Sequence, residues 1–329
     1  MRLGLLLGMG KDWRASVEQV RIAEDLGYAH IASGEAWGPS ILPWLTLVAA
    51  NTSRVTFGTA ILNCFSRTPA VMAQEFSMLD QISGGRAMLG LGSSGQFVIE
   101  HFNGVKFDRP LQRMRETVEI FNKLIAGEKL HHAGEIFQLK RGFQLDYARP
   151  RTKIPVAIAA ITPKSIEQTG EIAEGVIPIH WAKPRFPELR QQLNDAAKRA
   201  GREASFTIMP FTNVTVLDGH EDEKKWHAAR QQISFYVNQM GVFYWQMLVR
   251  SGYEAEVSAS RKAFAEKRYD EAIAAMSDRM VRDLQVIGRI DEVKEQLRER
   301  AALGADLQLI YAPRAEGREF AQQLEALVR

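Results

Sequence analysis

Two apolar stretches decide the fold: VTFGTAILN at residues 55–63 and SGGRAMLGLG at residues 83–92. Between them, SRTP at residues 66–69 opens a segment of helical period that runs to about residue 80. Thr68 is a typical N-cap residue, and proline is favoured in the first helical turn that follows it. The order is therefore strand, helix, strand. Both strands end in small or polar residues, which is where enzymes built from parallel β–α units carry their chemistry.

The same alternation continues along the rest of the chain. Short apolar runs alternate with longer segments of helical period, which is typical of repeated β–α units. We predict strands near residues 3–9, 29–33, 55–61, 86–91, 155–160, 175–179, 206–216 and 306–310. We predict helices near residues 14–26, 40–52, 69–80, 110–126, 163–173, 186–200 and 315–328. Eight strands can close into a parallel barrel, so the predicted fold class is α/β, a (β/α)8 TIM barrel.

Two segments do not fit the simple repeat. Residues 127–154 are predicted to form a hairpin insertion after the fourth helix. Residues 218–287, between the seventh and eighth strands, are long, charged and helix-prone, and they contain the aromatic island Phe243-Tyr244-Trp245. This second insertion either covers the barrel mouth or makes a subunit contact. With both insertions, residues 1–329 are expected to form a single domain.

Composition excludes several classes of function. The 42 basic and 39 acidic residues give a net charge of +3 and are spread along the chain, whereas a nucleic-acid site needs clustered basic residues. Cys64 is the only cysteine, so a disulfide within the chain or a thiolate metal site is not possible. No apolar run approaches the ~20 residues that span a bilayer, and the apolar run at residues 3–7 is too short for a signal peptide and lacks a small-residue cleavage site after it. We therefore expect a cytoplasmic enzyme that uses no metal, no membrane and no nucleic acid.

The strand ends supply the candidate site residues. Glu35 and Trp37 follow the second strand, where a carboxylate and an indole suit acid–base chemistry and a substrate wall. A merely solvated carboxylate at the rim is compatible with the same residues. His180 ends the sixth strand and could line the mouth. After the fifth strand, residues 158–165 run into a helix, whose free N-terminal amides suit a phosphate group or belong to an ordinary capped helix.

The stretches at residues 55–63, 83–92 and 158–165 resemble the bacterial luciferase-like superfamily, which binds flavin or deazaflavin in a TIM barrel. Residues 90–105 resemble the branch that contains methylene-tetrahydromethanopterin reductase and other oxidoreductases dependent on the deazaflavin coenzyme F420. Two positions depart from that branch: Gln96 stands where proline is common, and Thr162 stands where glycine is common.

The resemblance implies a set of cofactor contacts. It implies a bulge at Ala60-Ile61, in many relatives a cis peptide bond, against the back of the ring, and it places Asn63 near the polar edge of the ring. The other implied cofactor contacts are Ser93, Ser94 and Gly95 after the fourth strand, Ala159, Ala160, Ile161 and Thr162 at the phosphate, and Ile179. Related deazaflavin enzymes carry acidic, histidine or tryptophan side chains at the rim, so Glu35 and Trp37 become the catalytic candidates.

The resemblance also implies the activity. The expected reaction is transfer of a hydride between F420 and a small organic substrate: a carbonyl, an imine or an activated alkene, or the reverse oxidation. The first alternative is an FMN-dependent monooxygenase that uses O2, and the second is a barrel that binds flavin without catalysis. Family habit predicts a homodimer.

Overall fold

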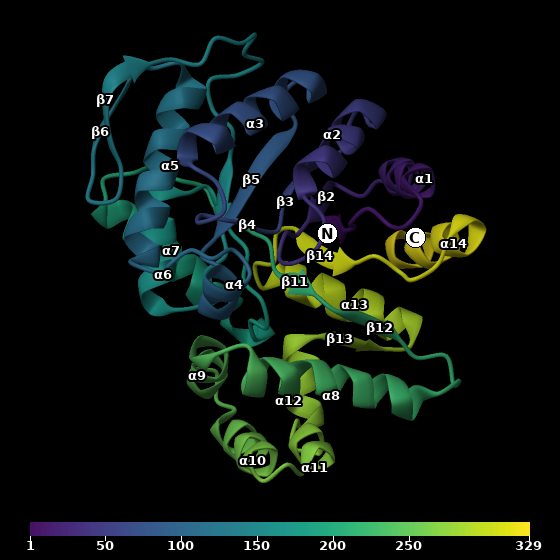
Figure 1. Cartoon of the computed structure of the whole chain (residues 1–329). Helices are drawn as coiled ribbons and strands as arrows, with labels where there is room; N and C mark the ends of the chain where they lie inside the picture. The colour runs from purple at the N-terminus through teal and green to yellow at the C-terminus, as the bar shows by residue number, and fades with distance from the viewer.

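The computed structural model describes residues 1–329, and a ring of parallel strands surrounded by helices lies at its centre (Figure 1). The ring contains β1 (Leu3–Leu6), β2 (His30–Ser33), β3 (Thr56–Thr59), β4 (Leu62–Asn63), β5 (Ala87–Gly92), β8 (Val156–Ile158), β9 (Gly175–Val176), β10 (Thr207–Ile208), β11 (Phe211–Thr212) and β14 (Gln308–Tyr311). Pairing follows the order β10-β9-β8-β5-β3-β2-β1-β14-β11. Because only Met209 and Pro210 separate β10 from β11, the two ends of this order join and the sheet closes. If β3 with β4 and β10 with β11 are each counted as one interrupted strand, the ring has eight strands, and the predicted barrel is confirmed.

Eight helices cover the outside of the barrel. They are α1 (Trp13–Asp25), α2 (Ile41–Asn51), α3 (Pro69–Ser83), α5 (Pro110–Ala126), α6 (Pro163–Ile172), α7 (Phe186–Arg199), α13 (Ile290–Ala302) and α14 (Gly317–Val328). The sequence predicted all of these except α13, whose buried side chains are only Val293, Leu297 and Arg300. So narrow an apolar stripe gives little helical periodicity to detect. The short helix α4 (Gln96–His101), which follows β5, was also missed.

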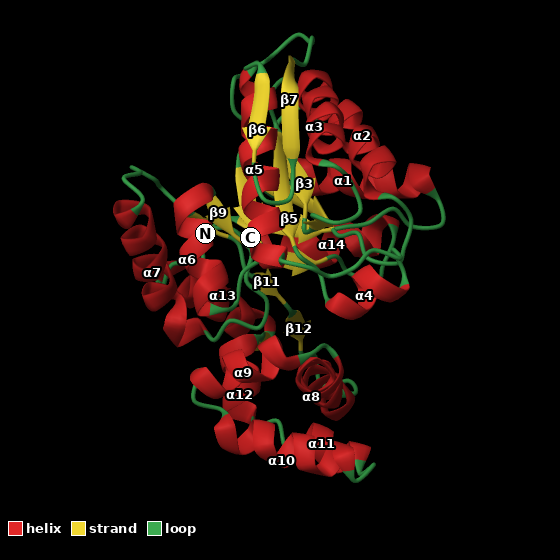
Figure 2. Cartoon of the chain, turned by 60° about the vertical axis from the view of Figure 1, so that its left-hand side comes forward, coloured by secondary structure: helices red, strands yellow, loops and turns green.

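Two further segments leave the barrel, at the places where the sequence departs from the repeat. After α5, the antiparallel strands β6 (Leu130–Ala133) and β7 (Gln138–Phe143) form a hairpin that stands at the top of Figure 2. After β11, β12 (Val214–Val216) pairs with β13 (Val286–Gly288). The chain between them forms α8 (Asp222–Gln239), α9 (Val242–Arg250), α10 (Glu254–Ala265), α11 (Tyr269–Ala274) and α12 (Asp278–Leu284), gathered at the bottom of Figures 1 and 2. None of the helices is both long and apolar enough to cross a membrane.

The hairpin is held to the barrel by Glu116 of α5. Its buried carboxylate accepts hydrogen bonds of 2.8–3.1 Å from the backbone N–H groups of Glu135, Ile136 and Phe137. Burial by itself raises the pKa of Glu116. The hydrogen bonds from Gln112 and from the three backbone N–H groups outweigh burial and lower the pKa to about 2. The hairpin is therefore fixed by an ionised carboxylate.

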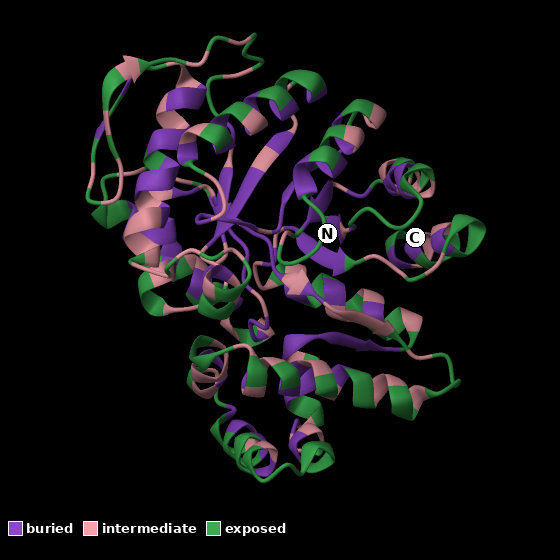
Figure 3. Cartoon of the chain, viewed as in Figure 1, coloured by how far each residue is buried: buried purple, intermediate pink, exposed green.

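The apolar core has two parts. One lies between the strands and the helices, where Figure 3 shows buried strands and helices that are buried only on their inner sides. The other fills the inside of the barrel and consists of Ala32, Ala60, Ala157, Ile177, Met209, Leu307 and Leu309. Leu6, Ile61 and Phe211, which lie near the carboxyl ends of strands, pack against this inner cluster. The barrel is thus filled below its carboxyl-terminal mouth.

Candidate active site

The predicted site residues come together at one end of the barrel. All strands of the ring run parallel, so their carboxyl ends meet at a single face. Glu35 and Trp37 follow β2, and Ala60, Ile61 and Asn63 lie at the end of β3 and in β4. The remaining predicted residues follow β5, β8 and β9: Ser93, Ser94, Gly95, Ala159, Ala160, Ile161, Thr162 and Ile179. In this family of folds, that face carries the active site.

The third strand has an irregular end. Gly58 pairs with Met88 of β5 and Leu62 pairs with Leu91, so four steps along one strand match three along the other. The extra residue makes a bulge, and the peptide bond between Ala60 and Ile61 within it is cis. The structure therefore has the bulge and the cis bond that the resemblance implied.

Two glycines allow the backbones around this bulge to approach closely. A Cβ on Gly90 of β5 would lie 1.7 Å from the carbonyl oxygen of Thr59, and one on Gly34 would lie 2.7 Å from that of Ala60. Any side chain at these positions would force the strands apart. β2, β3 and β5 consequently approach one another closely at this end of the barrel, and we call this region of the mouth the backbone half.

Asn63 contributes a polar group to the backbone half. Its Oδ1 accepts hydrogen bonds from the N–H groups of Phe65 at 3.0 Å and Ser66 at 2.7 Å, which fixes the turn into α3. Its Nδ2 donates no hydrogen bond within the chain. After β5, Ser94 has a positive φ of 59°, and the Oγ of Ser93 donates to its carbonyl oxygen at 3.2 Å. The amide of Asn63 is the free donor in this group.

The turn between β8 and α6 presents unpaired backbone N–H groups. Thr162 and Ser165 satisfy each other in a reciprocal cap, with distances of 3.0 and 3.2 Å. The N–H groups of Ala160, Ile161 and Lys164 have no acceptor in the chain. Ala159 donates to the carbonyl of Leu91 at 2.8 Å, so the turn adjoins the end of β5. Three free donors at a helix N-terminus suit an anion.

Glu35 is held in an ion pair. Its carboxylate receives two hydrogen bonds from Arg67, at 2.5 and 3.1 Å, and one from the N–H of Ile41 at 3.1 Å. The two side chains are only 11% and 16% exposed. Burial raises the pKa of Glu35, but the bonds from Arg67 and Ile41 lower it below its ordinary value. An ionised, fully engaged carboxylate fits a positioning role better than donation of a proton.

Trp37 lies in the loop after β2 and is 66% exposed. Its place beside the mouth agrees with a substrate wall, but its ring has no aromatic partner in the structure. Its catalytic role therefore stays a prediction.

The other side of the mouth is aromatic, and the sequence did not single out most of it. Tyr311 at the end of β14 stacks on Phe211 of β11 with ring centroids 6.2 Å apart. Tyr236 of α8 meets the ring of His180 at 4.4 Å and the ring of Tyr244 in α9 at 5.0 Å. We call these five residues the aromatic wall. Only His180 and the island containing Tyr244 carried a signal in the sequence; the others are single aromatics in ordinary strands or helices.

His180 has a buried nitrogen without a partner, and three tyrosines of the wall carry phenols that bond to no atom of the chain. His180 is 3% exposed, and its Nε2 has no hydrogen-bond partner. Burial lowers the pKa of His180 to about 4, so the imidazole is neutral at physiological pH. Leaving a buried polar group unpaired costs about 1–3 kcal/mol. The phenolic oxygens of Tyr236, Tyr244 and Tyr311 likewise make no hydrogen bond within the chain.

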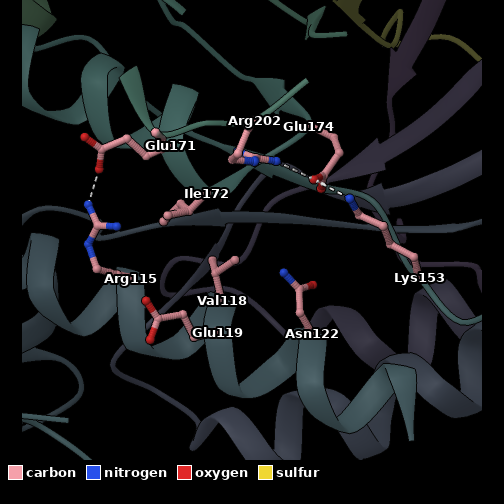
Figure 4. A pocket seen from close by; sticks show the side chains of 10 residues that line it. Arg115, Val118, Glu119, Asn122, Lys153, Glu171, Ile172, Glu174 and Arg202 are labelled. Carbon is pink, nitrogen blue, oxygen red and sulfur yellow. Dashed lines mark hydrogen bonds and ion pairs between the residues drawn. The ribbon is translucent and has the colours of Figure 1, made fainter. Parts of the chain in front are cut away.

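An open groove of about 490 Å³ lies away from this mouth, between α5 and α6 (Figure 4). Its polar side chains pair with one another: Arg115 with Glu171, and Glu174 with both Lys153 and Arg202. Glu174 and Lys153 lie at the amino ends of β9 and β8, on the face that serves stability in barrel enzymes. We therefore place the candidate site at the mouth and not in this groove.

Comparison with known proteins agrees with this barrel. The sequence profile of the family described as luciferase-like monooxygenase matches residues 1–307. The chain belongs to the luciferase-like monooxygenase family. The expectation of a luciferase-like fold is thereby confirmed.

Individual luciferase-like relatives extend the match over nearly the whole chain. A Mycobacterium tuberculosis protein that bears the name coenzyme F420-dependent oxidoreductase is 30% identical over 339 aligned positions, 96% of each chain. The 5,10-methylenetetrahydromethanopterin reductase of Archaeoglobus fulgidus is 28% identical and covers 87% of this chain and 85% of its own. The structure of the coenzyme F420-dependent tetrahydromethanopterin reductase from Methanopyrus kandleri superposes with a TM-score of 0.82 at 22% identity, covering 100% and 97% of the two chains. At this level of identity, the match with the Methanopyrus kandleri structure shows only that the two chains have the same fold.

Proposed function

We propose that this protein transfers a hydride between coenzyme F420 and a small organic substrate, which is a carbonyl, an imine or an activated alkene, or an alcohol in the reverse direction. The observation that carries the proposal is the backbone half of the mouth, where Gly34 and Gly90 let the strand ends approach closely and which adjoins a turn with three free N–H groups. Two relatives that cover most of the chain and bear the names of an F420-dependent oxidoreductase and a reductase of this branch support the choice of cofactor.

The residues fit a deazaflavin. We assign the flat ring to the Ala60–Ile61 peptide, where Gly34 and Gly90 carry no side chain and let the backbones approach closely. Asn63 offers its free Nδ2 to a ring oxygen. Serines 93 and 94, with Gly95, follow the strand next to the ring, and we assign them to the polar edge or the tail, with Ile179 on the opposite side of the mouth.

The phosphate fits the turn before α6. Its oxygens would accept from the free N–H groups of Ala160, Ile161 and Lys164, at the positive end of the helix dipole. Arg250 of α9 adds a cation there, since its Nη2 lies 3.5 Å from the carbonyl oxygen of Ile161. The site thus offers both donors and positive charge to an anion.

F420 supplies the hydride chemistry when it is bound, and the protein supplies position and exclusion of water. In this proposal Trp37 forms part of the substrate wall. The ionised carboxylate of Glu35 holds Arg67 and the first turn of α2, and so fixes the loop that carries Trp37. The role in catalysis first expected for Glu35 becomes a positioning role.

An FMN-dependent monooxygenase is the second candidate. The description of the matching family favours it, because that description names monooxygenases. Reduced FMN activates O2, whereas a deazaflavin transfers hydride and reacts poorly with O2. The same flat ring site would serve either cofactor.

The test is a titration of the purified protein with F420 and with FMN, followed by intrinsic tryptophan fluorescence. We expect micromolar or tighter binding of F420, weaker binding of FMN, and no O2 consumption with reduced F420. Insertion of one alanine before Pro163 should abolish binding, because it displaces the free N–H groups. Preference for FMN with O2 consumption would favour the monooxygenase. Tight binding of F420 without turnover of any carbonyl, imine, alkene or alcohol would favour a non-catalytic barrel.

We also propose that the chain acts as a single-domain, cytoplasmic homodimer. One continuous apolar core, from Leu3 to Leu327, includes Val237 and Met280 of the α8–α12 segment and supports a single domain. Val71 and Met78, which lie on one side of α3, are exposed and support an interface. A single thermal transition and a light-scattering mass of two chains are the expected results, with cell fractionation to check the compartment.

A further inference from the structure

We propose that the aromatic wall is the substrate-binding surface for neutral, planar carbonyl compounds, and that Tyr236 is the group that donates a hydrogen bond to the carbonyl oxygen. This inference rests on the proposed hydride transfer, because it assigns the substrate to the half of the mouth opposite the ring site.

The wall stands on the inside of the barrel. Leu307 and Leu309 belong to the inner apolar cluster, so Tyr311, two residues further on, faces the same side of β14. Phe211 packs on that cluster directly, and Tyr311 stacks on Phe211 with an angle of 25° between the rings. These two rings therefore lie on top of the inner apolar cluster, at the mouth of the barrel.

Tyr236 of α8 contacts the two remaining members of the wall, His180 and Tyr244. Its ring meets His180 and Tyr244 edge-on, at interplanar angles of 71° in both cases. Tyr311 and Tyr244 also contribute, after burial, to the raised pKa of the Tyr236 phenol. Side chains from β11, β14, α8, α9 and the segment after β9 thus converge at one place.

The chemistry of this surface selects its ligand. None of the five side chains carries a charge at neutral pH, and their partly exposed rings suit a flat apolar molecule. The Nε2 of His180 is buried there without a hydrogen-bond partner, and the three phenols bond to no atom of the chain. A ligand that brings an acceptor can take the place of water on such phenols, and a carbonyl oxygen is such an acceptor.

Tyr236 supplies the proton that the reduction of a carbonyl requires. Addition of a hydride from the reduced cofactor gives the carbonyl carbon two electrons and one hydrogen. The electron pair of the C=O π bond moves to the oxygen, which becomes an alkoxide. The phenol of Tyr236 gives its proton to that oxygen, an O–H bond forms, and the phenolate takes a proton from solvent. Burial, with smaller contributions from Tyr311 and Tyr244, raises the pKa of Tyr236, so the phenol is protonated before the reaction.

The experiment compares Tyr236→Phe with Tyr269→Phe, which alters an exposed tyrosine of α11 outside the mouth. With reduced F420 and benzaldehyde, we expect Tyr236→Phe to lower kcat by about 100-fold, the size of a general-acid contribution. The affinity for F420 should stay within about twofold. Cyclohexanecarbaldehyde should be a poorer substrate than benzaldehyde for the wild type. Tyr269→Phe should match the wild type throughout.

A binding measurement separates failure of this inference from failure of the proposed function. Benzamide keeps the planar carbonyl but resists reduction, and saturation-transfer NMR should detect it on the wild type with or without F420. Tyr236→Phe should weaken it by about threefold or more, the value of one hydrogen bond. If F420 does not bind at all, the proposed function fails, and the benzamide result still decides the inference. No benzamide signal on the wild type, or equal signals and rates for wild type and Tyr236→Phe, would overturn it.

Discussion

The two halves of the barrel mouth are built by opposite means. The backbone half brings strands together so closely that Gly34 and Gly90 can carry no side chain, and it presents peptide groups. The aromatic wall fills the other half with large rings, two of which come from helices outside the barrel repeat. A surface of fixed backbone suits a cofactor that is always the same, whereas side chains on inserted helices can be exchanged without disturbing the barrel. The difference assigns the cofactor to one half and the substrate to the other.

The largest effect is expected from Gly90→Ala. The new methyl group would lie 1.7 Å from the carbonyl oxygen of Thr59, so β3 and β5 could not pair as they do. We expect a loss of more than about 4 kcal/mol, in the range reserved for severe core disruption. Yield of folded protein and the midpoint of thermal unfolding measure it. Gly38→Ala is the matched control, because a methyl group there meets no atom within 4 Å. Equal stability of the two variants would show that the backbone half is not closely packed.

Gly34→Ala should separate binding from folding. Its methyl group would press on the carbonyl of Ala60 from 2.7 Å, just after the end of β2, where the loop can yield. The protein should fold, but the affinity for F420 should fall by about tenfold, or 1.4 kcal/mol. The affinity for benzamide should not change. A loss of benzamide binding with F420 binding intact would reverse the assignment of the two halves.

Glu35→Gln tests the positioning role of the carboxylate. It removes the charge from a pair with Arg67 that is largely shielded from water, and we expect the free energy of unfolding to fall by about 2 kcal/mol. The rate with benzaldehyde should stay within about threefold, because Tyr236 and not Glu35 delivers the proton. Urea unfolding and steady-state rates measure the two effects. A rate loss of the size predicted for Tyr236→Phe would instead make Glu35 the acid.

Glu116→Gln gives a reference outside both halves. The ordinary pKa of this carboxyl is 4.5 and its folded value is about 2. Because the folded pKa is lower, the ionised group stabilises the protein above pH 4.5, and that contribution disappears as the pH falls toward 2. We expect the variant to be about 2 kcal/mol less stable than the wild type at pH 7 and nearly equal to it at pH 2. A constant difference across this range would show that the charge of Glu116 does not hold the hairpin. F420 and benzamide binding at pH 7 should be unchanged.

The backbone half could be predicted from sequence, because its signals are local. Residues 55–63 and 83–92 carry the signals of β3 and β5 and include Gly90, and both ends of α5 were predicted correctly. The bulge at Ala60-Ile61 was implied by the family resemblance and not by the local sequence. Helix α13 was missed since it buries little apolar surface. The ion pair between Glu35 and Arg67 could not be predicted because it is not local in sequence: it joins two loops that only the closed barrel brings together.

The aromatic wall could not be predicted as a unit. Its members lie far apart in the chain, and nothing near Phe211 or Tyr311 distinguishes them from other aromatics in apolar strands. Tyr236 faces the mouth only because α8 folds back over it, and no local pattern sets that direction. The sequence indicated that the 218–287 segment covers the mouth or makes a subunit contact; Tyr236 and Tyr244 now support the first alternative.

The most direct measurement is a crystal structure of the protein with F420 and benzamide. We predict the deazaflavin ring against the Ala60–Ile61 peptide, its phosphate on the N–H groups of Ala160, Ile161 and Lys164, and the benzamide oxygen within hydrogen-bond distance of the Tyr236 phenol. Electron density for the cofactor in the groove between α5 and α6, or a ring stacked on the aromatic wall, would contradict the division of the mouth described above.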